Sequence, residues 1–158
     1  MYKLVHAWAP DVAPLGMVSK EVPGIKNGGG KAGRWTASFV SPGRGQVRIV
    51  SYSVVAAPPD ISKGVDVGPP LPWGGPTRDA MPFQTSEFAI DSEAAYETAL
   101  AKAKGWVKAH PGKEEAALTL GNNASRFRAP VWFVLWGTNK SGYAAYVNAT
   151  TGAEVNAK

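Results

Sequence analysis

The chain contains no cysteine, which excludes disulfide bonds, thiolate nucleophiles and cysteine-ligated metal centres. Histidine is almost absent too: the two histidines, His6 and His110, lie far apart, and neither stands in a nucleophile motif. Acidic residues such as Asp60, Asp66 and Asp79 are scattered, without the spacing of a metal site or of a catalytic carboxylate pair. We therefore expect no catalytic residue, no metal and no cofactor, and we predict that the protein is not an enzyme.

Long apolar runs are also missing. No stretch approaches the ~20 apolar residues that a membrane-spanning helix needs, so the sequence predicts no transmembrane segment. Residues 1–10 lack the apolar core of a signal peptide. Two locations follow: cytoplasmic if Met1 is the native start, and extracytoplasmic, in the periplasm or secreted, if a leader was removed.

What is present is enough apolar material for a core and an excess of positive charge. The 158 residues are 44% hydrophobic, which suits one ordinary domain or two very small ones. The net charge is +5. The segment from Val22 to Pro59 contains no acidic residue, and its cations are Lys26, Lys31, Arg34, Arg44 and Arg48. This segment is either a solvated basic sheet edge or an anion-binding face.

Residues 92–109 have the clearest helical pattern. Asp91 and Ser92 offer an N-cap, lysines occupy the last turns, and Pro111-Gly112 ends the helix. One apolar stripe runs along it, formed by Tyr96, Ala99, Leu100, Ala103 and Val107. A short helix is expected within residues 2–9, and strands at 16–22, 35–40, 46–55, 115–120, 131–136 and 143–147.

The Gly-rich loop at 28–33 matches G-x-G-x-x-G, but a strand follows it where a nucleotide site needs a helix. We therefore interpret this segment as a flexible approach to a hairpin and predict no nucleotide site there.

The C-terminal part resembles the PepSY family. The resemblance covers residues 92–158: a helix, a strand, a second strand after Pro130 that contains Trp132, and then Tyr-Ala-Ala-Tyr-Val-Asn-Ala-Thr-Thr-Gly-Ala-Glu-Val at 143–155. The family usually has Asp where this chain has Asn148, which leaves any role of that acidic residue, metal contact included, unsupported here. The resemblance implies an exported, non-catalytic module associated with peptidase restraint and with interactions at the cell envelope.

The two ends of the chain share an order of elements, which suggests a degenerate internal duplication. The fold class we expect is α+β, with two similar αβββ halves, each a helix packed on a small antiparallel sheet. Residues 1–57 would form a degenerate first PepSY-like half, 58–86 a Pro/Gly-rich connection, and 87–158 the second half. The core should contain Trp35, Phe39, Tyr96, Leu100, Val131, Phe133, Leu135, Tyr143 and Val147.

Three binding hypotheses remain. In the first, a sheet edge or the Pro-rich connection meets a protein partner. In the second, a basic and aromatic surface holds an acidic polymer, either nucleic acid or an anionic polysaccharide. In the third, the chain is a subunit of a homo-oligomer or larger assembly, and the connection with Trp73 lies over a neighbour. The candidate partner-binding residues are Trp73, Arg34, Arg44, Arg48, Arg126 and Arg128.

Overall fold

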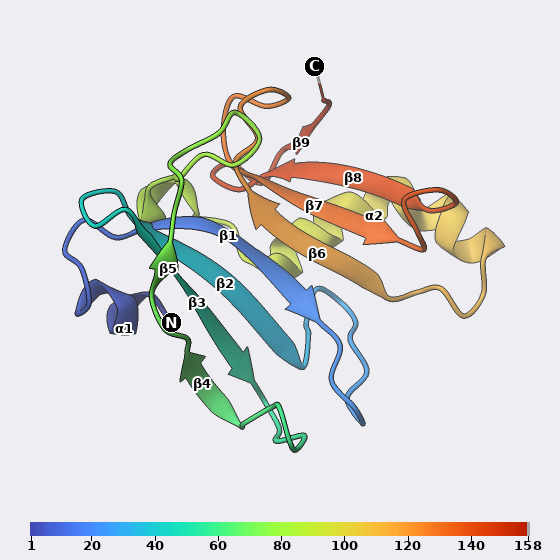
Figure 1. The fold of residues 1–158 in the computed structure, drawn as a ribbon. Coiled ribbons are helices and arrows are strands. Elements are labelled where there is room, and N and C mark those ends of the chain that lie inside the picture. The colour runs from blue at the N-terminus through green and yellow to red at the C-terminus, as the bar shows by residue number, and fades with distance from the viewer. Residues whose placement is uncertain (158) are drawn as a thin grey trace.

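The computed structural model describes residues 1–157, and its main feature is one antiparallel sheet of nine strands (Figure 1). The strands are β1 (Ala13–Lys20), β2 (Arg34–Ser41), β3 (Gln46–Ser53), β4 (Gly64–Val67), β5 (Leu71–Pro72), β6 (Ala116–Gly121), β7 (Val131–Trp136), β8 (Tyr143–Asn148) and β9 (Glu154–Val155). The helices are α1 (Tyr2–His6), a 3-10 turn η1 (Thr85–Glu87) and α2 (Ser92–Ala109). Within residues 1–157, no helix has the length and apolarity needed to cross a membrane.

The expected division into two αβββ halves, each with its own small sheet, is wrong. The strand order is β4-β3-β2-β1-β6-β7-β8-β9, with β5 also pairing with β3, so β1 joins strands from both ends of the chain. Strands hold 37% of the residues and helices 17%, which makes the fold sheet-dominated. The physical reason is the hydrogen bonding of backbone groups at strand edges. Two separate sheets would leave β1 and β6 as open edges, and their mutual pairing satisfies those backbone groups.

Both helices lie on one side of this sheet, which we call the covered face. A row of directly opposed apolar side chains crosses that face from β4 to β8, in the order Val67, Val50, Ala37, Met17, Leu120, Trp132 and Val147. One core cluster lies under α1 and a larger one under α2, and Met17 packs against both. The covered face therefore carries a nearly continuous core.

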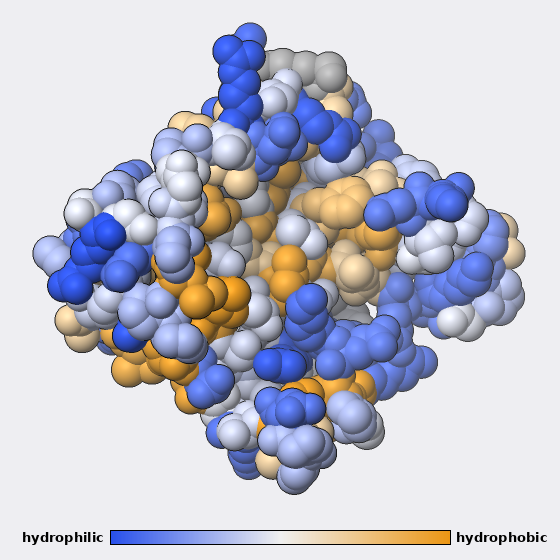
Figure 2. All heavy atoms as spheres, in the orientation of Figure 1, coloured by the Kyte–Doolittle hydropathy of each residue, from blue (hydrophilic) through white to orange (hydrophobic). Residues whose placement is uncertain are grey.

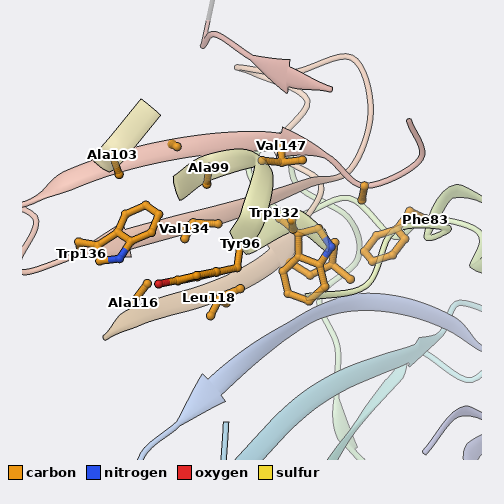
Figure 3. Close-up of a cluster of buried hydrophobic side chains, with 14 residues drawn as sticks. Phe83, Tyr96, Ala99, Ala103, Ala116, Leu118, Trp132, Val134, Trp136 and Val147 are labelled. Carbon is orange, nitrogen blue, oxygen red and sulfur yellow. The ribbon is translucent and has the colours of Figure 1, made fainter. Parts of the chain in front are cut away.

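Size complementarity seats α2 on the sheet. The helix turns small side chains inward, with Ala95, Ala99 and Ala103 fully buried. Large side chains from β7 fill the space beneath it, and Figure 3 shows Tyr96 lying between Trp132 and Trp136. The Trp132 indole N–H also donates a 2.9 Å hydrogen bond to the Ile90 carbonyl, which ties β7 to the start of α2.

The core prediction is partly wrong for β7, because it buries the wrong side of this strand. Trp132, Val134 and Trp136 are fully buried under α2, whereas Phe133 and Leu135 lie on the other face and are half-buried. Because β7 is an unbroken apolar run, its sequence shows no alternation that would indicate the inner side. Among the other predicted core residues, Phe39, Tyr96, Val131 and Val147 are buried, and Trp35, Leu100 and Tyr143 are half-buried.

The Pro-rich connection is held along the sheet at several points. It supplies β4 and β5, and the Trp73 amide donates to the Gly45 carbonyl at 2.9 Å. Further on, the Met81 amide donates to the Asn122 carbonyl at 2.9 Å and the Phe83 amide to the Pro14 carbonyl at 3.0 Å. The domain boundaries proposed for residues 57/58 and 86/87 stay a prediction.

Asp11 ties the segment after α1 to the β2–β3 turn. The Ser41 hydroxyl donates to one carboxylate oxygen at 2.6 Å and the Gly43 amide donates to the other at 2.6 Å. These hydrogen bonds stabilise the charged form, so the pKa of Asp11 lies below its ordinary value, first through Ser41 and then through Gly43.

We expect Trp132→Phe to lower the free energy of unfolding by about 2–4 kcal/mol, because it leaves a cavity under α2 and removes the bond to Ile90. Trp106→Phe, at a half-buried position on α2, is the control and should cost less.

Since one sheet links both clusters, urea unfolding should be a single transition with coincident circular dichroism and fluorescence midpoints. Two separated transitions would contradict a continuous cooperative sheet.

We expect Asp11→Asn to lower the melting temperature at neutral pH and to lose this effect in acid. A folded-state pKa below the unfolded value of about 3.9 gives stability that is present above that pH and disappears as pH falls through the folded-state pKa. Melting curves of both proteins between about pH 6 and pH 2 should therefore converge at the acid end. A difference that persists to pH 2 would show that the carboxylate charge is not its cause.

Candidate binding groove on the open sheet face

The side of the sheet opposite the helices, here called the open face, is turned toward the viewer in Figures 1 and 2. Cross-strand pairing places small, hydroxyl and aromatic side chains in one row across it, in the order Ser51, Thr36, Val18, Thr119, Phe133, Tyr146 and Val155. Figure 2 shows this side hollowed, with apolar and near-neutral atoms in the hollow, hydrophilic atoms around much of it, and a further apolar area at the left. The open face is therefore the large recessed surface of the molecule that no helix fills.

Two facing glycines deepen the hollow. Gly16 on β1 pairs directly with Gly121 on β6, so this part of the floor has no side chain. Next to it lies a cavity of about 220 Å³, here called the aromatic cavity. Its lining includes Thr119, Gly121, Phe133 and Tyr146 from the sheet, and Asp79, Asn122 and Asn123 from the rim.

Three aromatic rings build one wall. Phe133 stacks on Tyr146 with ring centroids 5.2 Å apart, and the Phe127 ring centroid lies 4.8 Å from that of Tyr146. Phe127 reaches the wall from the β6–β7 loop, where its amide donates to the Asn123 carbonyl at 2.9 Å. It is buried, so the loop is fixed to the sheet at this point.

Arg126 lies over this aromatic wall. Its guanidinium carbon is 5.0 Å from the Tyr146 ring centroid and 5.5 Å from that of Phe127, within the range of cation–π attraction. Its Nη2 donates a 2.9 Å hydrogen bond to the Tyr146 hydroxyl. The residue is exposed, and among residues 1–157 no carboxylate forms an ion pair with it.

A second cavity, of about 470 Å³, adjoins the first and shares Arg126, Phe127 and Val131 with it. We call it the arginine cavity, and the two together the groove. Its remaining lining is Arg128, Ala129, Asn148, Val155 and Asn156. No acidic residue among residues 1–157 lines the arginine cavity, whose lining combines the two arginines with two asparagines and the apolar residues Phe127, Ala129, Val131 and Val155.

Asn148, where the PepSY pattern has Asp, shapes the turn at the end of this cavity. Its side-chain oxygen accepts hydrogen bonds from the amides of Thr150 at 2.8 Å and Thr151 at 3.0 Å. This is the local hydrogen bonding that favours Asn or Asp in turns. The residue therefore has a structural role, and within residues 1–157 no group of three or more acidic or histidine residues could hold a metal ion.

The six residues proposed from sequence fall in separate places. Arg126 and Arg128 line the arginine cavity together. On the covered face, Arg44 and Arg48 lie 5.8 Å and 5.1 Å from the Trp8 ring. Arg34 lies on the open face with Nη2 3.4 Å from the Ser51 hydroxyl, and half-buried Trp73 is held beside Gly45. In the described part of the chain, none of these last four lines the groove.

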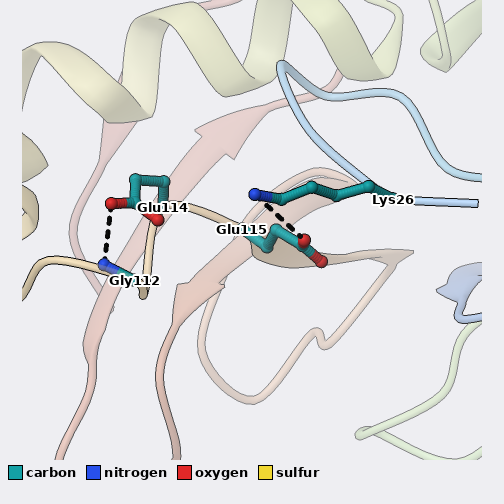
Figure 4. Close-up of polar contacts among 4 residues, drawn as sticks. All are labelled: Lys26, Gly112, Glu114 and Glu115. Carbon is teal, nitrogen blue, oxygen red and sulfur yellow. Dashed lines mark hydrogen bonds and ion pairs between the residues drawn. The ribbon is translucent and has the colours of Figure 1, made fainter.

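The basic segment from Val22 to Pro59 is partly neutralised within the fold. Lys26 meets Glu115 at 3.9 Å beside the turn in which Glu114 accepts from the Gly112 amide at 2.8 Å (Figure 4). That hydrogen bond lowers the pKa of Glu114. Lys31 meets Glu93 at 3.3 Å near the start of α2. These exposed pairs add little stability, but they place acidic groups next to two cations of the segment for which a solvated sheet edge and an anion-binding face were the two alternatives.

The Gly-rich loop closes against α2. Gly30, with a positive φ of 81°, lies so near the first residues of the helix that a Cβ would clash with the Ser92 carbonyl oxygen. Glycine is therefore required at this position for close packing.

Sequence reasoning missed Phe127 and Tyr146 and placed Phe133 in the core. For Tyr146 the signal is its place between Ala145 and Val147 in β8: the structure buries both of these, so Tyr146 faces the other side. Pairing with β7 then brings Phe133 beside it. Phe127 lies in the β6–β7 loop, where no alternation marks it.

No protein-family model and no curated protein matches this chain. Among solved structures, the chain is similar to a protein of Clostridium difficile 630 described as a "putative lipoprotein". The TM-score is 0.56 over 99% of this chain and 88% of that one, with 8% sequence identity. At this level of identity, the likeness shows a shared fold.

We expect Phe127→Ala to cost about 3 kcal/mol of unfolding free energy, because a buried aromatic ring is removed from the wall of the groove. Tyr146→Phe should cost less than about 1 kcal/mol, since it removes one exposed hydrogen bond and keeps the ring stack. Urea denaturation of both variants measures the difference. Equal losses would contradict the assignment of Phe127 as the anchor of the β6–β7 loop.

Proposed function

We propose that this protein is a non-catalytic binding module of the cell envelope or secreted space, and that its open sheet face binds another protein. The envelope location is supported by the structural neighbour, which is described as a "putative lipoprotein". The PepSY resemblance of residues 92–158 belongs to the same proposal. In that segment α2, β6, β7 and β8 follow in the order that the resemblance implies.

The observation that carries the proposal is the asymmetry of the sheet. One face is covered by both helices and the core, and the other is a recessed surface with an apolar floor and aromatic and arginine side chains in its wall. Aromatic residues and arginine are the side chains most enriched in the binding centres of protein interfaces. A recess of this composition suits a segment of a partner protein, whether that partner is a peptidase or a subunit of a larger assembly.

The acidic-polymer hypothesis has less support. A charged polymer is held best by a continuous track of cations. Here Lys26 and Lys31 meet acidic side chains, and Arg44 and Arg48 lie on the covered face with Trp8. The cations therefore form separate groups on different surfaces.

Gly121→Val tests whether the open face is the binding surface. A Cβ at Gly121 would meet no atom within 4 Å, and the residue has no positive φ, so valine should fill the aromatic cavity without straining the strand. Gly105→Val is the matched control, since Gly105 is exposed on α2 and a Cβ there also meets no atom within 4 Å.

The measurement is a pull-down from envelope and secreted fractions of the source organism with the native chain and both variants, washed at about 0.5 M salt to screen weak charge contacts. We expect one or a few proteins to be retained by the native chain and by Gly105→Val, and to be reduced at least tenfold on Gly121→Val. Equal retention by all three proteins would show that the open face is not the binding surface.

A further inference from the structure

We propose that the segment bound in the groove is an acidic peptide in extended conformation, with a carboxylate held by Arg126 and Arg128 and an apolar side chain seated on the floor beside them. This inference rests on the proposed function, because it specifies the chemistry of the partner at the same face. The inference assigns binding of the acidic group to the groove and not to the other cationic parts of the surface.

Arg126 is preorganised to hold a carboxylate. Its guanidinium carbon lies over the rings of both Tyr146 and Phe127, and the Tyr146 hydroxyl accepts a hydrogen bond from Nη2. Since a guanidinium has five N–H donors and Tyr146 takes one, others remain for a two-point bond to a carboxylate. Stacking lowers the entropy that the side chain loses when it binds.

Charge complementarity indicates that the bound group carries a negative charge. Arg126 and Arg128 both line the arginine cavity, and within residues 1–157 neither forms an ion pair and no carboxylate lines that cavity. Asp79 lines the adjoining aromatic cavity and not the arginine cavity. An acidic group therefore gains most by entering at the arginine cavity.

The floor sets the second requirement. Phe127, Val131 and Val155 give the arginine cavity apolar surface directly beside the guanidinium groups. A ligand made only of charged groups would leave this surface in contact with water. A segment that has an apolar residue close to its acidic residue covers this apolar surface. The burial adds a hydrophobic contribution to the free energy of binding, beside that of the ion pair.

The sheet edge favours an extended peptide over other ligands. β9 is the last strand of the sheet, and its outer edge has no strand partner in residues 1–157. A peptide strand can pair with such an edge through its backbone. Side chains two residues apart in a strand share one face, so an acidic and an apolar residue at that spacing would both point toward the groove.

Fluorescence anisotropy with labelled peptides tests this pattern on the full chain at about 0.15 M salt. The probe SETLTES places two glutamates and the leucine on one face of a strand. SELTTES has the same composition with the leucine on the opposite face, and SQTLTQS lacks the charge. We expect SETLTES to bind at least fivefold more tightly than either control. Equal affinity for SELTTES or SQTLTQS would overturn the inference.

The variants locate the site. Arg126→Gln should weaken SETLTES at least tenfold, because a charge-assisted two-point bond is lost, and Arg128→Gln should weaken it about threefold or more. Arg126→Lys keeps the charge without the planar fork and should fall between the native chain and Arg126→Gln. Arg44→Gln removes the same charge away from the groove and should stay within twofold. Melting temperatures of all variants confirm that they fold.

Two further outcomes separate this inference from the proposed function. If SETLTES fails to bind while Gly121→Val still loses its captured protein, the acidic-peptide inference is wrong and the open-face function stands. If the peptide fails and Gly121→Val also behaves like the native chain, both fail. Tighter binding of an oligothymidylate, weakened equally by Arg44→Gln and Arg126→Gln, would overturn the inference in favour of an acidic polymer.

Discussion

β1 and β6 pair through three residues of each strand, and the arrangement of both faces depends on this contact. The register sets Met17 opposite Leu120 on the covered face and Gly16 opposite Gly121 on the open face. A slip of one residue would turn the side chains of all strands on one side of the junction to the wrong face. The core under α2 would then lose continuity with the core under α1, and the groove would lose its glycine floor. The same short pairing therefore determines both stability and the shape of the candidate site.

Local pattern predicts the elements of this chain well and their assembly poorly. The strand expected at 131–136 coincides with β7, and the helix begins at Ser92 as its N-cap pattern indicates. Partner choice is different, because it depends on contacts between distant residues: the Leu118 amide donates to the Ser19 hydroxyl across 99 positions. A helix followed by three strands near each end of a chain is compatible with two small sheets or with one large sheet. The unpaired edges of β1 and β6 decide for the large sheet, and no local pattern expresses that.

The sequence predicted the arginines of the groove but not its aromatic wall. Arg126 and Arg128 could be named from charge alone, yet their aromatic support depends on which side of β7 faces α2. The alanines of α2 hold that information indirectly. A helix with small inward side chains leaves space above the sheet that large side chains must fill, and Trp132 and Trp136 fill it here. Reading the helix stripe together with the strand would have turned Phe133 outward, next to Tyr146.

The placement of the cations carries more meaning than their sum. Lys26 and Lys31 lie beside carboxylates, and Arg44 and Arg48 are stacked on Trp8 in the covered half of the molecule. Among residues 1–157, none of these four cations lines the groove. Arg126 is engaged on one side only: aromatic rings fix its orientation, and no acidic group of the described chain neutralises it. An arginine that is oriented without being neutralised retains its capacity to bind an anion. Arg126 also lines a cavity with apolar walls, where a ligand can reach it, and this distinguishes it from Arg44 and Arg48.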